Sequence, residues 1–176
     1  VFRQGTMNYV RNNLVLGSGE WGIHVDNGDP PAPATTGGQI VAFNTVVGSG
    51  RLAGTGGIRF QNATGEIRDN VLADNASSGI RTDQSTTVVH HNLVARSATA
   101  FDRVGGSVAP LWANLVADPL FTDAGAGDLT LQQVPAGQAA TSPAVDAGSG
   151  PVAALDVSGS TRRDGVADAG LADMGF

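Results

Sequence analysis

The stretch IRDNVLADNASSGIRTDQ (67–84) contains both halves of a repeat that runs through most of this chain. The first half is an aliphatic-x-x-Asn-x-aliphatic motif, and the second half begins with Gly-Ile. The asparagine motif occurs five times, around Asn13, Asn44, Asn70, Asn92 and Asn114. The second motif appears as GIHVDN (22–27), GIRFQN (57–62), GIRTDQ (79–84) and, degraded, AFDRVG (100–105). Self-similarity at such a period indicates stacked repeats.

The basic unit is about 22 residues long, and longer units carry insertions near GSGRLAGTG (48–56) and DPPAPATTG (29–37). A unit of this length, with short strands and no helical periodicity, predicts one coil of a parallel β-helix. The leucine pattern of leucine-rich repeats is missing. We therefore predict an all-β fold, a single-stranded right-handed parallel β-helix of about five coils over residues 1–117.

The motif asparagines are predicted to form a structural ladder. A side-chain amide at a turn can satisfy backbone groups and bond the equivalent amide of the next coil. Asparagine also tolerates the left-handed backbone conformation that sharp corners require. The ladder members would be Asn13, Asn44, Asn70, Asn92 and Asn114.

His90 and His91 stand directly before one ladder member, Asn92. Two adjacent histidines could form a metal or catalytic site, but the corresponding positions in other coils supply no second ligand of the usual type apart from Asp69. We therefore favour a structural role for this pair.

Composition excludes several classes of function. All 10 basic residues are arginine, and they face 16 acidic residues, for a net charge of −6. We expect no nucleic-acid partner, because such a partner requires a basic surface. The chain has no cysteine, and no apolar run is long enough for a membrane span.

The residues after Ala117 resemble the C-terminal end of secreted bacterial right-handed β-helix proteins of the pectate-lyase-like superfamily. The resemblance rests on Asp118–Phe121, Gly127–Leu131, Ser142–Gly148 and Arg163–Gly165, with a weaker match at Asp173–Phe176. It implies a secreted or cell-surface bacterial protein. Residues 118–176 would be a capping segment, with Leu120, Phe121, Leu129 and Leu131 covering the end of the core. The upstream end has no such cap, so we expect further coils before Val1, or self-association through that end.

The Gly-Ile motif predicts the best candidate binding surface. If its isoleucines point inward, the next residue and the one two further on point outward. The first column contains His24, Arg59, Arg81 and Asp102, and the second contains Asp26, Gln61, Asp83 and Val104. We expect substrate contacts from Arg59, Arg81, His24, Gln61 and Asp83. The other interpretation is a solvated face whose opposite charges pair across coils.

The resemblance implies an extracellular, acidic polysaccharide as the ligand, with arginines holding uronate carboxylates. A lyase would use Arg81 or His24 as its base. A hydrolase would use Asp26 and Asp83, which lie two coils and roughly 9–10 Å apart by strand spacing. The alternative function is a structural or adhesive surface module without glycan activity. We expect no required cofactor; Asp26 with Asp29, and the turn at 156–160, are the candidate Ca²⁺ ligands.

Overall fold

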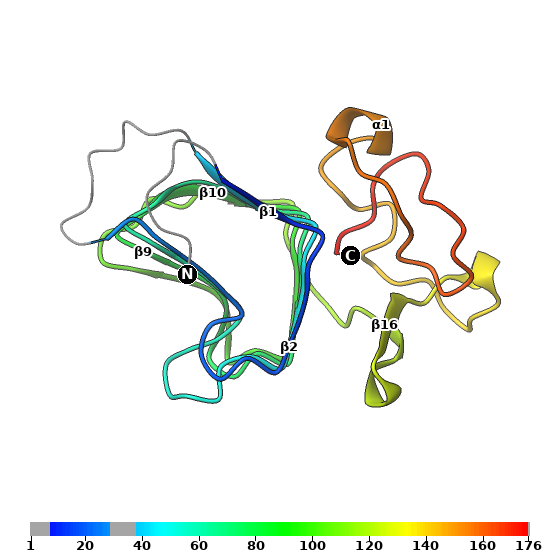
Figure 1. Cartoon of the computed structure of the whole chain (residues 1–176), viewed down its shortest axis with the longest axis horizontal. Coiled ribbons are helices and arrows are strands. Elements are labelled where there is room, and N and C mark those ends of the chain that lie inside the picture. The colour runs from blue at the N-terminus through cyan, green and yellow to red at the C-terminus, as the bar shows by residue number, and fades with distance from the viewer. Residues whose placement is uncertain (1–7, 29–37, 176) are drawn as a thin grey trace.

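The computed structural model describes residues 8–28 and 38–175. It is a parallel β-solenoid with a tail at its side (Figure 1). The complete coils contain β1 (Tyr9–Arg11), β2 (Leu14–Leu16) and β3 (Ile23–Asp26); β4 (Gln39–Ala42), β5 (Thr45–Val47) and β6 (Ile58–Gln61); β7 (Thr64–Arg68), β8 (Val71–Ala73) and β9 (Ser78–Asp83); and β10 (Thr86–His90), β11 (Leu93–Ala95) and β12 (Thr99–Val104). A partial coil follows, with β13 (Leu111–Trp112) and β14 (Leu115–Val116). The predicted all-β solenoid is confirmed, with about four turns.

Three parallel sheets form the walls. Sheet 1 has the order β1-β4-β7-β10-β13, sheet 2 the order β14-β11-β8-β5-β2, and sheet 3 the order β12-β9-β6-β3. Equivalent residues of successive coils pair directly, as Ile67 does with Val89 and Leu72 with Val94. Equal register keeps each column of side chains on one face, because a slip of one residue would reverse the face.

The core is the inside of this cylinder. Its buried columns are Val10, Val41, Ile67 and Val89 from sheet 1, Val46, Leu72 and Val94 from sheet 2, and Ile23, Ile58 and Ile80 from sheet 3. Branched aliphatic side chains suit this position, since they fill a pleated surface well. Burying one such side chain contributes roughly 1.5–3 kcal/mol.

Glycine of the Gly-Ile motif is required by this core. A Cβ at Gly79 would lie 2.3 Å from a methyl of Val94 and 2.9 Å from the carbonyl oxygen of Ala100. A Cβ at the equivalent glycines, Gly22 and Gly57, would lie 2.4 Å from Val46 and 2.7 Å from Leu72. The motif therefore begins with glycine because the neighbouring sheet fills the space.

The motif asparagines form a ladder at the corner between sheets 1 and 2. Each Nδ2 donates to the Oδ1 of the next asparagine at 2.9–3.0 Å, from Asn13 as far as Asn114. The backbone N–H of each of the first four ladder asparagines also donates to the Oδ1 of the next asparagine. The left-handed conformation falls one residue earlier than we expected, at Asn12, Phe43, Asp69, His91 and Ala113, whose φ angles are 49° to 57°. Because the preceding residue makes the turn, the asparagine side chain can reach the asparagine of the next coil.

A second ladder, which sequence analysis missed, lines the corner between sheets 3 and 1. Ser85 N–H donates to Ser107 Oγ at 3.1 Å, and Ala63 N–H donates to Ser85 Oγ at 3.2 Å. A serine repeated at the period of the coils is the signal that would have identified it.

Residues 118–175 lie beside the solenoid rather than over its end (Figure 1). They include β15 (Phe121–Asp123), β16 (Asp128–Leu131), α1 (Val152–Leu155) and the short 3₁₀ turns Ala124–Ala126 and Val134–Ala136. Phe121, Leu129 and Leu131 pack with Met174 on the outer face of sheet 2, against its residues Val71, Ala73, Leu93 and Ala95. We expected the tail to cap the end of the core, but it covers the side of the solenoid instead. The reason is that sheet 2 is apolar on both of its faces, so its outer face also has to be buried.

The last complete coil places a charged side chain at its open end. Arg103 follows Phe60 and Thr82 in an inward-facing column and donates from Nη1 to the carbonyl oxygen of Ala109 at 3.2 Å. An inward-pointing charge blunts an exposed strand edge.

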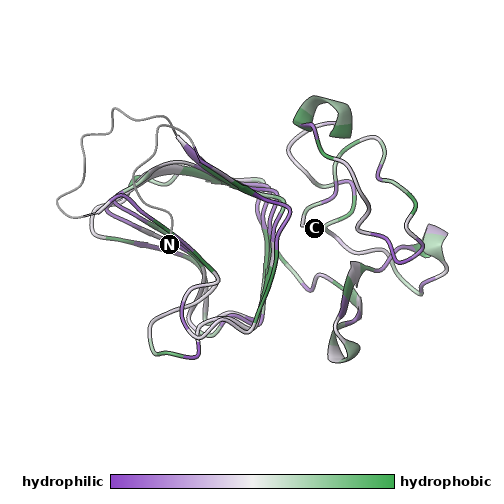
Figure 2. Cartoon of the chain, in the orientation of Figure 1, coloured by the Kyte–Doolittle hydropathy of each residue, from purple (hydrophilic) through white to green (hydrophobic). Residues whose placement is uncertain are grey.

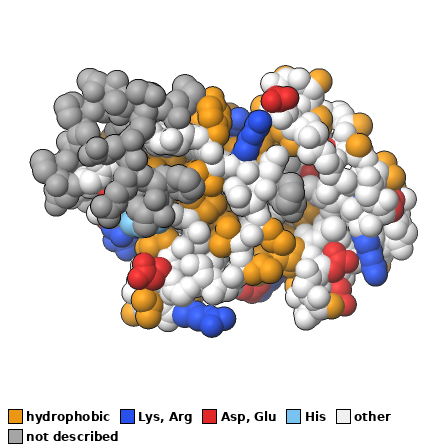
Figure 3. Space-filling model, in the orientation of Figure 1, with side chains coloured by type: hydrophobic (Ala, Val, Ile, Leu, Met, Phe, Trp, Pro, Cys, Tyr) orange, Lys and Arg blue, Asp and Glu red, His pale blue; other side chains and the backbone are white. Residues whose placement is uncertain are grey.

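Hydrophobic side chains remain at the surface of the solenoid (Figure 3). In the first coil, Tyr9, Leu14 and Leu16 are exposed. Self-association through this end stays a prediction. Within the described part of the chain, no helix is long and apolar enough to cross a membrane.

Candidate functional site

The outer face of sheet 3, here called the GI face, carries the two predicted columns. His24, Arg59, Arg81 and Asp102 occupy one register position on β3, β6, β9 and β12, and Asp26, Gln61, Asp83 and Val104 occupy the other. The intervening Ile58, Phe60 and Ile80 are buried in the core, so the named side chains point outward. The sheet therefore brings together every residue that we expected to contact substrate.

The charged side chains of the GI face pair with one another across coils. Arg59 Nη2 lies 2.7 Å from Asp83 Oδ2, and Arg81 lies 3.8 Å from the same oxygen. Arg81 Nη1 also lies 3.6 Å from Asp102 Oδ2. The four side chains are only 17 to 29% exposed, so these pairs are screened less than fully solvated ones. The pairing that we weighed against a binding role is thus present.

Some polar atoms of the network have no partner among the described residues. Arg59 Nε, Arg81 Nε and His24 Nε2 are buried and make no hydrogen bond. The Arg59 guanidinium also lies over the ring of buried Trp21, 5.8 Å from its centroid. Incompletely satisfied polar groups of this kind call for a structural or functional explanation.

The surroundings of His24 favour its neutral imidazole form. Burial, and then the neighbouring Arg59 charge, lower the pKa of His24, and Asp26 and Gln61 only partly oppose this. A neutral imidazole can accept a proton, which suits the base that a lyase needs. Its Nε2 is nevertheless buried, so this nitrogen does not reach a bound polymer without rearrangement.

The other catalytic candidates fit less well. An arginine side chain does not give up its proton in proteins, and Arg81 is paired with two carboxylates, so it does not suit a base. Asp83 binds two guanidinium groups, and Asp26 Oδ1 accepts from Gly28 N–H at 2.8 Å in a turn. Both carboxylates are thus already held by partners within the protein.

The calcium candidates are not brought together among the described residues. Asp29 lies outside them, and Asp26 is engaged in its turn. Asp156, of the turn at 156–160, is exposed and lies 3.5 Å from Arg11.

His90 and His91 belong to an aromatic stack. The His90 ring lies parallel to Trp112 of the next coil, with centroids 4.3 Å apart, and His91 meets Trp112 edge-on at 4.8 Å. The two Nδ1 atoms are 2.9 Å apart, a hydrogen-bonding distance. Burial is the main cause that lowers the pKa of His90. With Asn92 in the ladder and His91 at the left-handed corner, the pair is a consequence of the architecture.

A carboxylate cluster in the tail was missed by sequence analysis. Asp146, Asp168 and Asp173 bring oxygens within 4.8 Å of one another, the one such group of possible metal ligands in the described chain. Asp173 is buried and accepts from Asp146 N–H, Gln133 Nε2 and the Thr161 hydroxyl. Burial raises the pKa of Asp173, and the two neighbouring carboxylates add to this. These contacts join four separate tail segments, so the tail motifs have a structural role.

Comparison with protein-family models, with curated proteins and with solved structures finds no match for this chain.

Proposed function

We propose that this chain recognises an extracellular polysaccharide along the GI face. The observation that supports the proposal is the half-buried Arg59–Asp83–Arg81–Asp102 network, which repeats polar groups at the spacing of the coils, about 4.8 Å. A polymer lying along such a column meets donors and acceptors at each coil. Recognition without catalysis agrees with the absence of a free acid–base pair among the described residues of this face.

The charge of the face decides which polymer fits. Its described groups are two arginines against Asp26, Asp83 and Asp102, with His24 neutral. A uronate would have to displace an aspartate from its arginine, whereas sugar hydroxyls can bond the outer edges of the pairs without breaking them. We therefore propose a neutral, hydroxyl-rich polymer in place of the acidic one expected from the sequence. A secreted or cell-surface location, and membership in the pectate-lyase-like superfamily, belong to the same proposal and rest on the tail motifs.

The second candidate is a structural or adhesive module without glycan activity. It is favoured by the ion pairs themselves, because both arginines already have partners within the protein. In that case the GI face contributes to coil packing and solubility alone.

A binding and turnover screen separates these functions. The folded protein is tested against pectate, alginate, hyaluronan and neutral glucans, galactans and mannans, with and without Ca²⁺. Arg59→Ala/Arg81→Ala should weaken binding of a neutral polymer at least tenfold, since a hydrogen bond to a charged group contributes about 1.5–3 kcal/mol. The matched control is Arg51→Ala/Arg96→Ala, which removes the same charge away from the GI face.

Each result selects one function. Binding of pectate or alginate that the double variant loses would restore the acidic ligand, and unsaturated uronate products would make the protein a lyase. If no polymer binds to the folded wild type, the structural module is the correct function. Equal losses in both double variants would place the binding elsewhere. Thermal unfolding of all three proteins shows whether a loss of binding reflects a loss of structure.

A further inference from the structure

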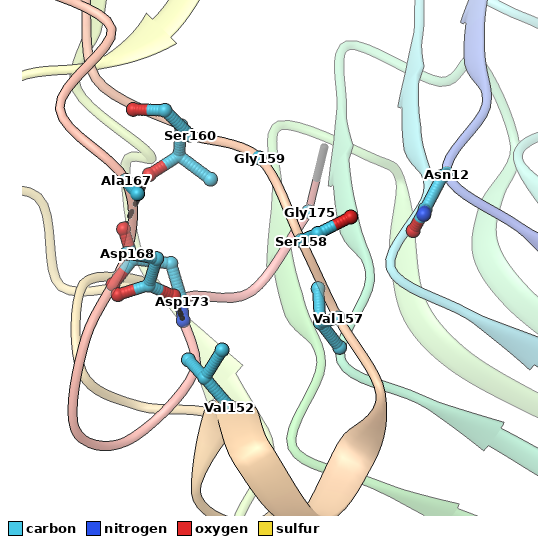
Figure 4. Close-up of a pocket in the computed structure, with 11 residues that line it drawn as sticks. Asn12, Val152, Val157, Ser158, Gly159, Ser160, Ala167, Asp168, Asp173 and Gly175 are labelled. Carbon is cyan, nitrogen blue, oxygen red and sulfur yellow. Dashed lines mark hydrogen bonds between the residues drawn. The ribbon is translucent and has the colours of Figure 1, made fainter.

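A pocket lies where the tail meets the first coil (Figure 4). Its volume is about 240 Å³, below the roughly 300–1,000 Å³ of pockets for drug-sized ligands. Its walls include Asn12 of the solenoid and, from the tail, Val152, Val157, Ser158, Asp168 and Asp173. It shares no residue with the GI face, so the inference drawn from it does not rest on the proposed function.

Among the described residues, the Asn12 side chain has no tail partner of the kind that its equivalents in the next two coils have. In the next two coils the same left-handed corner position holds Phe43 and Asp69. Phe43 packs against Ala172, Val152 and Leu155, and Asp69 accepts from Ser149 N–H and Oγ at 2.7 Å each. Asn12 Oδ1, by contrast, is buried without a hydrogen bond in the described structure. A buried acceptor left in this state costs about 1–3 kcal/mol, which a donor from a ligand would recover.

Other groups of the pocket also have hydrogen-bonding capacity to spare. Asp168 Oδ2 accepts from Asp173 N–H at 2.8 Å, and within the described residues its Oδ1 accepts nothing. The Ser158 side chain is likewise without a described hydrogen bond, and Figure 4 shows it pointing toward the side of Asn12. Both oxygens of Asp173 are already used by Asp146, Gln133 and Thr161. The pocket therefore offers two acceptors and one hydroxyl.

These groups define the ligand by its chemistry. Two acceptors require a ligand with donors, and the apolar wall of Val152 and Val157 requires a ligand face that carries C–H groups. An anion is excluded, because none of the described lining residues is basic and two are aspartates. We propose that the pocket binds a single neutral sugar residue, with hydroxyls donating to Asn12 Oδ1 and Asp168 Oδ1 and a ring face against the valines.

The test is a titration followed by amide chemical shifts, using methyl glucoside, methyl galactoside, methyl mannoside, glucosamine and glucuronate. At least one neutral methyl glycoside should shift signals around Asn12 and residues 157–168. Asn12→Gly, which keeps the left-handed backbone without strain, should weaken that binding roughly five- to hundredfold. Ser158→Phe should abolish it by filling the pocket. Because Ser158 is exposed, the variant should fold; Ala98→Phe, at an exposed turn remote from the pocket, is the matched control.

The possible results are decisive. A neutral glycoside that loses affinity in Asn12→Gly and Ser158→Phe, but not in Ala98→Phe, supports the proposal. A response to glucosamine alone would overturn the neutral class, since the aspartates would then be binding an ammonium group. Failure of every methyl glycoside with a folded wild type, or unchanged binding in Ser158→Phe, would refute the site. Neither failure bears on polymer binding at the GI face, which the Arg59/Arg81 variant tests separately.

Discussion

A ladder asparagine satisfies several buried groups at once. Asn70 Oδ1 accepts from both the backbone and the side chain of Asn44, and its Nδ2 is close to Val41 O, Arg68 O and Asn92 Oδ1. No other short side chain can do this, because it needs an acceptor and two donors on one planar group. The preceding corner residue pays about 1–3 kcal/mol for its left-handed conformation, and the ladder supplies the contacts that maintain it.

Asn70→Ala should therefore be one of the most destabilising single substitutions in the solenoid. It leaves donors and acceptors of three coils unpaired in a fully buried place, so the free energy of unfolding should fall by about 3–5 kcal/mol. Urea unfolding followed by circular dichroism measures this. Asn13→Ala, at the exposed end of the same ladder, is the control and should cost much less. Similar losses at both positions would show that the ladder contributes little beyond the corner itself.

At the level of strands and corners, the repeat predicts the register of the strands well and the details of the corners less well. The period placed the ladder and both GI columns in register, since stacked coils impose the same contact on equivalent residues. It could not predict that Arg59 pairs diagonally with Asp83 rather than with a residue of its own column, because that depends on side-chain rotamers. The left-handed corner was displaced by one residue, since Phe43 and His91 carry no turn signal.

The glycine of the Gly-Ile motif gives a prediction about the packing of strand β9. Gly79→Ala places a methyl group against Val94 and the Ala100 carbonyl, so we expect a loss of about 1–3 kcal/mol, typical of overpacking. Gly19→Ala, where nothing lies within 4 Å of the added carbon, is the control and should be neutral or stabilising. Thermal unfolding of both variants tests it. A Gly79→Ala protein as stable as the wild type would mean that sheet 2 moves aside freely.

At the level of the whole molecule, the tail adds a second layer beside the solenoid, on the outer face of sheet 2 (Figure 2). Its apolar residues cover sheet 2, and its polar contacts attach it to the ladder corner, where Gly175 N–H donates to Asp69 O and Ser149 bonds the Asp69 carboxylate. The consecutive apolar residues of β8 and β11 are the signal of a sheet buried on both faces, which sequence analysis missed. Ser149 bonds Asp69 from 80 positions further along the chain, a contact for which the sequence holds no local signal.

Removal of the tail should consequently change the association state. A chain ending at residue 117 exposes Val71, Ala73, Leu93 and Ala95 as one strip on a sheet, and such strips promote association. Light scattering should give a larger, concentration-dependent mass for this fragment than for the full chain at equal concentration. Val71→Thr/Leu93→Thr in the fragment should reduce the association, because threonine keeps the β-propensity and removes apolar surface. If the fragment keeps the mass of the full chain, the cover is dispensable for solubility. If both chains associate equally, the exposed Leu14 and Leu16 of the first coil are the surface to mutate, since they are common to both.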